Sequence, residues 1–148
     1  MADTRVQLQV EDWVRKEWMP KHFGQKFSRE RVNLTPGGIF DFDAVSDDET
    51  IVATISTSGA TTSSGKNAVG KLLKIRSDMF FLLLVNAKRR LVLLTELDMF
   101  ELCNKEKKGG RVPPEIEFIH VTIPKELNSR LKAARETASN EIGPKQRK

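Results

Sequence analysis

GGIFDFDAVSDDETIVATISTSGATTSSGKNAVGKLLK, residues 37–74, contains two aspartates in an apolar segment, and the rest of the chain is organised around it. Because side chains alternate along a strand, Asp41 and Asp43 share one face, about 7 Å apart. Carboxylates in so apolar a strand are costly to bury without a partner or a cation. The pattern of apolar residues predicts an acidic strand over 39–45, a turn over 46–50, a strand over 51–56, a polar loop over 57–67 and a helix over 66–77.

The remainder of the chain alternates helical and strand patterns around this stretch. We expect a helix over 6–19 ended by Pro20, a charged edge strand over 25–34, a buried central strand over 79–85, a strand beginning at 91–94, a helix from 96 capped by Thr95, a basic loop over 105–111, an outer strand over 115–123 and a final helix from Pro124. This order predicts one α/β domain over 1–142 with a mixed central sheet, followed by a flexible basic tail over 143–148.

The composition narrows the class of protein. The 148 residues are 39% apolar and 30% charged, which is typical of a globular protein with its own core. Cys103 is the one cysteine, which excludes an intramolecular disulfide and a cysteine zinc cluster. The N-terminus lacks the apolar core of a signal peptide, and the longest apolar run, 79–85, is too short to span a membrane. We therefore expect a cytoplasmic protein without a membrane partner.

The polar loop has some features of a phosphate-binding loop, since it precedes a helix and contains Gly65-Lys66. The P-loop signature, however, needs four residues between its glycines and a Ser or Thr after the lysine. Here five residues separate Gly59 from Gly65, and Asn67 follows the lysine. Nucleoside triphosphate hydrolysis is therefore not expected, although a helix start attracts phosphate and a looser anion site stays open.

The acidic strand and its neighbour resemble the core of the PD-(D/E)XK nuclease superfamily, the restriction-endonuclease-like fold. The segment Gly38–Val45 is similar to the Gly-led strand that carries the family's acidic residue. The family's next strand carries Asp/Glu-x-Lys, and the corresponding residues here are Thr54-Ile55-Ser56. The resemblance implies a restriction-endonuclease-like sandwich with an αβββαβ core and a C-terminal helix.

The resemblance also implies a set of site residues. Asp41 corresponds to the family's metal-binding aspartate, with Asp43 as the alternative, and the cofactor would be Mg²⁺ or Mn²⁺. An acidic residue on the first helix supports the metal in many members, a role that Glu11 or Glu17 would fill. The superfamily sometimes carries a relocated lysine on the helix after the second strand, and Lys71 or Lys74 would then replace the one missing at Ser56.

Basic side chains outside this set are candidates for contacts with phosphate groups. Most of the net charge of +5 lies in residues 125–148, and two shorter basic segments follow the apolar run and precede Pro113. Together with the loop lysine, the candidate nucleic-acid-binding residues are Lys66, Lys88, Arg89, Arg90, Lys107, Lys108 and Arg111.

Three functions follow as hypotheses. The neutral hydroxyls of Thr54 and Ser56 favour a nuclease-fold protein that binds nucleic acid, with DNA expected, through a site that has lost its standard chemistry. The alternative is an active, divergent metal-dependent endonuclease that uses Asp41 and Asp43, with Glu11 as a further candidate, and a relocated Lys71 or Lys74. A structural domain that binds a protein partner or a second copy of the chain is the third.

Overall fold

The computed structural model describes residues 4–61 and 67–141, with side chains described as far as Glu136. A five-stranded mixed sheet forms the centre, in the order β1 (Phe27–Asn33), β2 (Ile39–Ser46), β3 (Ile51–Ser56), β4 (Arg89–Leu94) and β5 (Ile116–His120). The pairs β1–β2 and β2–β3 are antiparallel, whereas β3–β4 and β4–β5 are parallel. The expected α/β class with a mixed sheet is confirmed.

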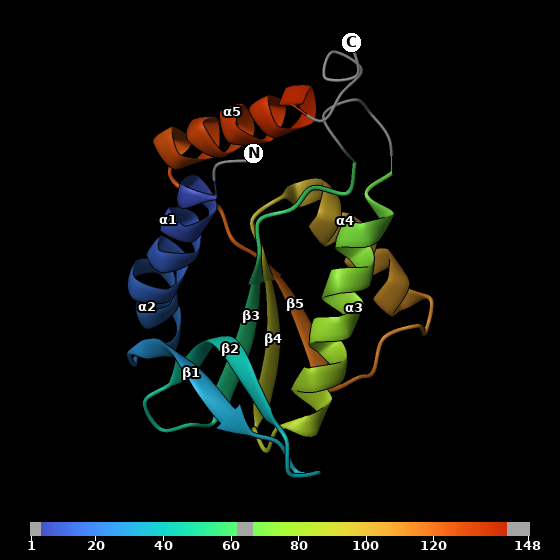
Figure 1. Cartoon of the computed structure of the whole chain (residues 1–148). Helices are drawn as coiled ribbons and strands as arrows, with labels where there is room; N and C mark the ends of the chain where they lie inside the picture. Colours follow the sequence, from blue (N-terminus) through green and yellow to red (C-terminus); the bar gives the residue numbers. More distant parts are fainter. Residues whose placement is uncertain (1–3, 62–66, 142–148) are drawn as a thin grey trace.

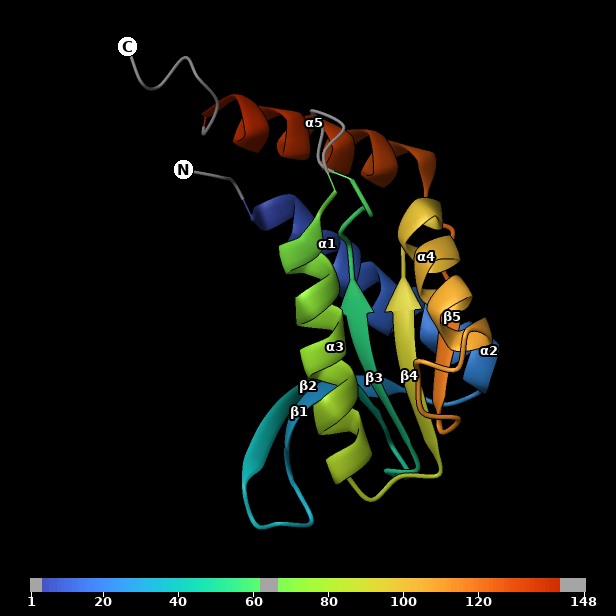
Figure 2. The same ribbon diagram turned by 90° about the vertical axis from the view of Figure 1, so that its right-hand side faces the viewer.

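Helices cover both faces of the sheet, so the core has two parts. Helix α1 (Arg5–Trp13) lies against one face of the sheet. Helices α3 (Val69–Leu84) and α4 (Leu97–Lys108) lie against the other face (Figures 1 and 2). Helix α5 (Lys125–Glu141) crosses the end of the sheet beside α1, and its Leu131 is fully buried in the core under α1.

The N-terminal helix runs further than its sequence predicts. After α1 the chain makes a π-helical turn, η1 (Val14–Trp18), and continues as α2 (Met19–Phe23) until Gly24, whose φ is +71°. Pro20 does not end the path, because it lies in the first turn of α2, directly after the π-helical turn. A left-handed glycine is a common helix terminator.

The prediction of a central strand over 79–85 is wrong, because these residues form the second half of α3. Ile75, Met79 and Leu82 follow one another at helical spacing and are buried on the sheet, whereas Phe80 is exposed. A short apolar run without Gly or Pro has the same composition in a buried strand and in a helix that packs on a sheet. The apolar run directly follows the helix predicted over 66–77, and in the structure it continues that helix.

Two smaller predictions also fail. Thr95 does not cap α4: the N-terminal cap position is Glu96, and the Thr95 hydroxyl instead donates to the Glu96 carboxylate at 2.9 Å. Lys105–Lys108 form the last turn of α4 and not a loop. Cationic side chains in the last turn are stabilised by the negative end of the helix dipole. The edge positions predicted for β1 and β5 are confirmed, and the tail over 143–148 lies outside the described residues.

Candidate functional site

A β-bulge in β2 places Asp43 at a special position. Ser28 of β1 pairs with Val45, and Glu30 pairs with Phe42, so two steps along β1 match three along β2. The extra residue falls at Asp43–Ala44, opposite Arg29. A bulge bends its strand and changes the direction of the side chains after it, and bulges are frequent beside active sites. Accordingly, Phe42 packs in the core under α3, but Ala44 packs in the core under α1.

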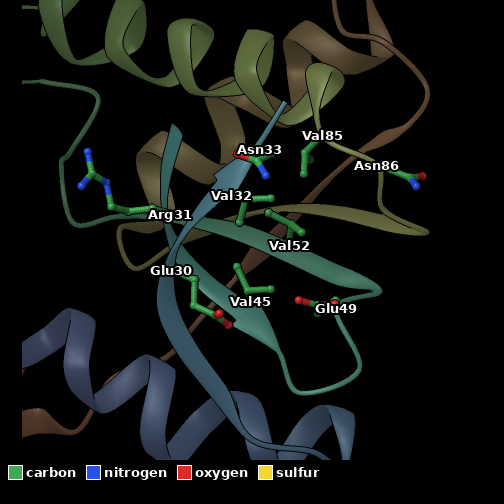
Figure 3. Close-up of a pocket in the computed structure, with 9 residues that line it drawn as sticks. All are labelled: Glu30, Arg31, Val32, Asn33, Val45, Glu49, Val52, Val85 and Asn86. Carbon is green, nitrogen blue, oxygen red and sulfur yellow. The ribbon is translucent and has the colours of Figure 1, made fainter. Parts of the chain in front are cut away.

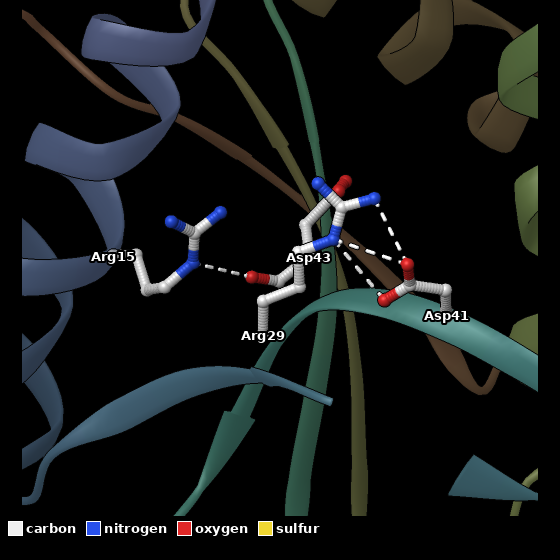
Figure 4. Close-up of polar contacts among 4 residues, drawn as sticks. All are labelled: Arg15, Arg29, Asp41 and Asp43. Atoms are coloured by element: carbon white, nitrogen blue, oxygen red, sulfur yellow. Dashed lines mark hydrogen bonds and ion pairs between the residues drawn. The ribbon is translucent and has the colours of Figure 1, made fainter. Parts of the chain in front are cut away.

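Beyond the bulge, β2 separates from β3, and the Asp43 side chain fills the gap. The two strands pair only at Ala44–Ala53 and Val45–Val52. The next N–H of β3 that faces β2, that of Ile55, donates to Asp43 Oδ2 at 2.8 Å. On the other side, Arg15 Nε of η1 donates to the Asp43 carbonyl oxygen at 2.6 Å (Figure 4). These two bonds hold the bulge between η1 and β3.

A groove of about 780 Å³ opens where the strands separate, between α1 and α3. Its charged lining residues come from three elements: Glu11 of α1, Asp43 of β2, and Lys71, Lys74 and Asp78 of α3. The structure therefore brings together four of the five residues that sequence reasoning assigned to catalysis. The sequence pattern also places Asp78, four residues after Lys74, on the same polar stripe, but sequence reasoning assigned it no role in the site.

Burial raises the pKa of each carboxyl group in this groove. For Asp43, burial is the main cause, the Ile55 N–H opposes it, and the negative charge of Asp78 adds to it. For Glu11, burial is again the main cause, and the charge of Asp43 adds to it. Burial likewise raises the pKa of Asp78, while Lys74 Nζ, which donates to Asp78 Oδ1 at 2.7 Å, opposes this rise. The groove thus contains three desolvated carboxyl groups, and the negative charge of Asp43 repels that of Glu11 and that of Asp78.

Asp41 lies outside the groove and has a cationic partner of its own. Arg29 donates from Nε and Nη2 to the Asp41 carboxylate, with the shortest contact at 2.9 Å (Figure 4). These hydrogen bonds lower the pKa of Asp41. Its assignment as a metal ligand stays a prediction, whereas Asp43, the alternative, lies in the groove.

The two residues at the positions of the Asp/Glu-x-Lys motif have different surroundings. Thr54 is only 3% exposed and does not line the groove. Ser56 lines the groove, and its hydroxyl oxygen accepts the N–H of Ser58 at 3.3 Å. The groove also contains a carboxylate from α3, that of Asp78.

The candidate nucleic-acid-binding residues lie away from the groove. Arg89 begins β4 beside Ile51, about 17 Å along the strand from the end that borders the groove, at roughly 3.3 Å per residue. Its guanidinium forms an ion pair with Glu117 at 2.8 Å. Arg90 donates to the carbonyl oxygens of Leu82 and Val85 and thus caps α3.

The remaining candidates lie at the same end of the sheet as Arg89 or outside the described residues. Lys107 donates to the carbonyl oxygen of Ile116, which pairs with Arg90. Lys88 and Lys108 are exposed, and the exposed Arg111 forms an ion pair with Glu106. Lys66 falls outside the described residues. The structure therefore separates these basic side chains from the carboxylates of the groove.

A second hollow, of about 290 Å³, lies under β1 and has a different character (Figure 3). Its floor is formed by valines 45, 52 and 85, and its rim by charged and amide side chains such as Glu49 and Asn86. It contains none of the predicted catalytic residues. Its mixed rim and apolar floor do not indicate a particular ligand.

The arrangement of metal-ligating side chains restricts how the groove could hold a cation. In residues 4–61 and 67–141, no set of three or more His, Cys, Asp and Glu side chains is arranged to hold a metal ion. A cation in the groove would therefore have to be held by two carboxylates, with water or a substrate oxygen completing its shell. Within the same ranges, no helix combines the length and the apolar composition that crossing a bilayer requires.

Comparisons of the chain with protein-family models, with curated proteins and with solved structures gave no match.

Proposed function

We propose that this protein is a divergent, metal-dependent nuclease that acts on phosphodiester bonds in the groove between α1 and α3. The observation that carries the proposal is the convergence of Glu11, Asp43 and Lys74 from three separate elements at one opening of the sheet. The order α1–β1–β2–β3–α3–β4 supports it, since this is the αβββαβ order of the PD-(D/E)XK superfamily. The bulge at Asp43 adds support, because bulges often serve to aim a functional side chain.

The donor set in the groove suits Mg²⁺ or Mn²⁺. Both ions prefer carboxylate oxygens as ligands. Glu11 and Asp43 are desolvated carboxylates whose negative charges repel each other. A divalent cation between them would offset this repulsion, so these two residues would hold it. When bound, such a cation supplies Lewis-acid polarisation of a phosphodiester.

The residues of α3 supply the remaining chemistry. Lys74 and Lys71 lie on the rim opposite Glu11, where their ammonium groups stabilise the negative charge that develops on a phosphodiester under attack. Asp78, which is 12% exposed, accepts from Lys74 and so keeps that ammonium group in the groove. In this arrangement, Lys74 takes the role that the resemblance assigns to the lysine missing at Ser56.

A second candidate function is binding of nucleic acid without cleavage. The observation that favours it is the burial of neutral Thr54 at the position where the superfamily carries a carboxylate. A neutral hydroxyl offers no charge to a cation, so the groove would then hold a phosphate backbone without activating water. The two candidates share a substrate class and differ in the reaction.

Cleavage of labelled single-stranded and double-stranded DNA and RNA in Mn²⁺ tests the proposal. We expect the wild type to cut at least one substrate, and Asp43→Asn to lose roughly 100-fold or more in rate, the scale on which removal of one catalytic group acts. Asp47→Asn, in the exposed turn between β2 and β3, is the matched control, since it removes the same charge outside the groove. Salt-dependent binding without cleavage would support the second candidate, and neither binding nor cleavage would contradict both.

A further inference from the structure

Arg29 of β1 lies opposite the bulge that aims Asp43. Two of its three guanidinium nitrogens, Nε and Nη2, contact Asp41, and among the described residues nothing accepts from Nη1. The side chain is 52% exposed, so a ligand can reach it. Asp41 therefore fixes the direction of the guanidinium group and leaves Nη1 able to donate to a ligand.

The surroundings of Arg29 are continuous with the groove. A neighbouring hollow of about 340 Å³ is lined by Arg29, Arg15 and Asp12, and it shares Glu11 with the main groove. Glu11 thus separates two parts of one surface, with Lys71 and Lys74 in one part and Arg29 in the other. Arg29 and Glu11 line the same hollow, and the positive charge of Arg29 lowers the pKa of both Glu11 and Asp43 against the effect of burial. Figure 4 shows Arg29 beside Asp41 and Asp43.

We propose that Arg29 binds a backbone phosphate of the nucleic-acid strand, adjacent to the phosphodiester held between the carboxylates and Lys74, and that Asp41 is a positioning residue for Arg29. This inference rests on the proposed function. The planar guanidinium group suits it, because it can bind Asp41 on one edge and a phosphate oxygen through Nη1. The strand would then cross the groove from α3 over Glu11 to β1.

The simplest competing explanation is that Arg29 and Asp41 form an ordinary surface ion pair. Such pairs contribute little to stability and have no reason to affect binding. The two explanations differ in what they predict for Arg31. This residue lies two positions further along β1, is exposed, directly faces Asp41 across the strands, and lines neither part of the groove. Arg31→Gln is therefore a matched control for Arg29→Gln.

Fluorescence anisotropy of short labelled DNA, measured over a range of salt concentrations, tests the inference. We expect Arg29→Gln to weaken binding roughly tenfold and to reduce the slope of log affinity against log salt by about one, as for loss of one phosphate contact. Arg31→Gln should change both quantities much less. Arg29→Lys should keep the slope and lose part of the affinity, because it keeps the charge but not the planar donor group. Equal effects of Arg29→Gln and Arg31→Gln would overturn the inference.

Asp41→Asn separates a positioning role from a catalytic one. We expect it to keep the salt slope and raise KM for cleavage with kcat nearly unchanged, because Arg29 stays charged but is less well oriented. Loss of kcat with unchanged KM would make Asp41 part of the reacting site and would overturn the assignment. Circular dichroism and melting curves of each variant exclude unfolding as a cause.

The outcomes also separate this inference from the proposed function. If the wild type binds and cleaves nucleic acid while Arg29→Gln behaves like Arg31→Gln, the inference fails and the function stands. If the wild type neither binds nor cleaves, both are overturned.

Discussion

Asp43 Oδ2 accepts the backbone N–H of Ile55 at 2.8 Å and so takes the place of a hydrogen bond that β2 no longer makes to β3. The same carboxyl group is desolvated at the base of the groove, which raises its pKa. Asp43 therefore serves the fold and the candidate site at once, and substitutions that keep or remove its oxygen separate the two roles.

Substitution of Asp43 tests this double role. Asp43→Asn keeps an oxygen that can accept the Ile55 N–H and removes a desolvated charge, so the free energy of unfolding should stay the same or rise. Asp43→Ala leaves the N–H without a partner and should cost about 2 kcal/mol. Urea denaturation measures both, and equal destabilisation by Asn and Ala would contradict the structural role of the oxygen.

The raised pKa of Glu11 predicts a specific dependence of stability on pH. Because its folded-state pKa lies above the ordinary value of 4.5, the folded state binds more protons in the window above 4.5, and stability falls as pH rises through that window. Glu11→Gln removes this loss. The variant should therefore gain stability over the wild type as pH increases from 4.5 and keep the gain at neutral pH.

Melting curves of Glu11→Gln and the wild type across this pH range check the prediction. Glu17→Gln, on the exposed side of η1, is the control for loss of a glutamate charge. A difference between Glu11→Gln and the wild type that is the same below and above pH 4.5 would contradict the burial of Glu11 as the cause.

Added Mn²⁺ should raise the melting temperature if Glu11 and Asp43 hold a cation. Binding to the folded state alone stabilises it by about 2.7 kcal/mol when the free ligand is at 100 times its dissociation constant. Asp43→Asn should lose this response, and Asp41→Asn should retain it. Differential scanning fluorimetry with and without chelator measures the shift, and a response that survives in Asp43→Asn would place the cation elsewhere.

Arg90 has a structural contact that distinguishes it from its neighbour Lys88. It donates to the carbonyl oxygens of Leu82 and Val85, so Arg90→Ala should lower the free energy of unfolding by about 2 kcal/mol. Lys88→Ala, at an exposed position, should change stability by less than about 0.5 kcal/mol. If both residues bound DNA, Arg90→Ala and Lys88→Ala would weaken DNA binding equally. We expect only Lys88→Ala to weaken DNA binding when both variants are measured as folded protein.

The second half of α3 provides a test of the helix that replaced a predicted strand. Phe80 is 57% exposed in the helix interior, so Phe80→Ala should change stability by less than about 0.5 kcal/mol. Phe80→Pro should cost about 3 kcal/mol or more, because proline removes a helical hydrogen bond and clashes with the preceding turn. Thermal denaturation measures both, and a tolerated proline would contradict the helix.

The sequence alone determined the local pattern of this protein. The alternation in 39–56 predicted β2, the turn and β3, and the charges of 25–34 and the polar alternation of 115–123 predicted the two edge strands. Strands and helices can be predicted in this way because the spacing of apolar residues along the chain differs between them. The resemblance based on the acidic strand and the helix after it also singled out Glu11, Asp43, Lys71 and Lys74, although it preferred Asp41 to Asp43.

Which of these residues meet in space depends on contacts between distant segments of the chain. The bulge at Asp43 depends on the register between β1 and β2, and the difference between Asp41, paired with Arg29, and Asp43, at the base of the groove, follows from it. The apolar run from Met79 became helix because its buried side chains pack on the sheet at helical spacing, and that choice brought Asp78 into the groove. Register and packing are relations between segments distant in sequence, so local periodicity could not supply them.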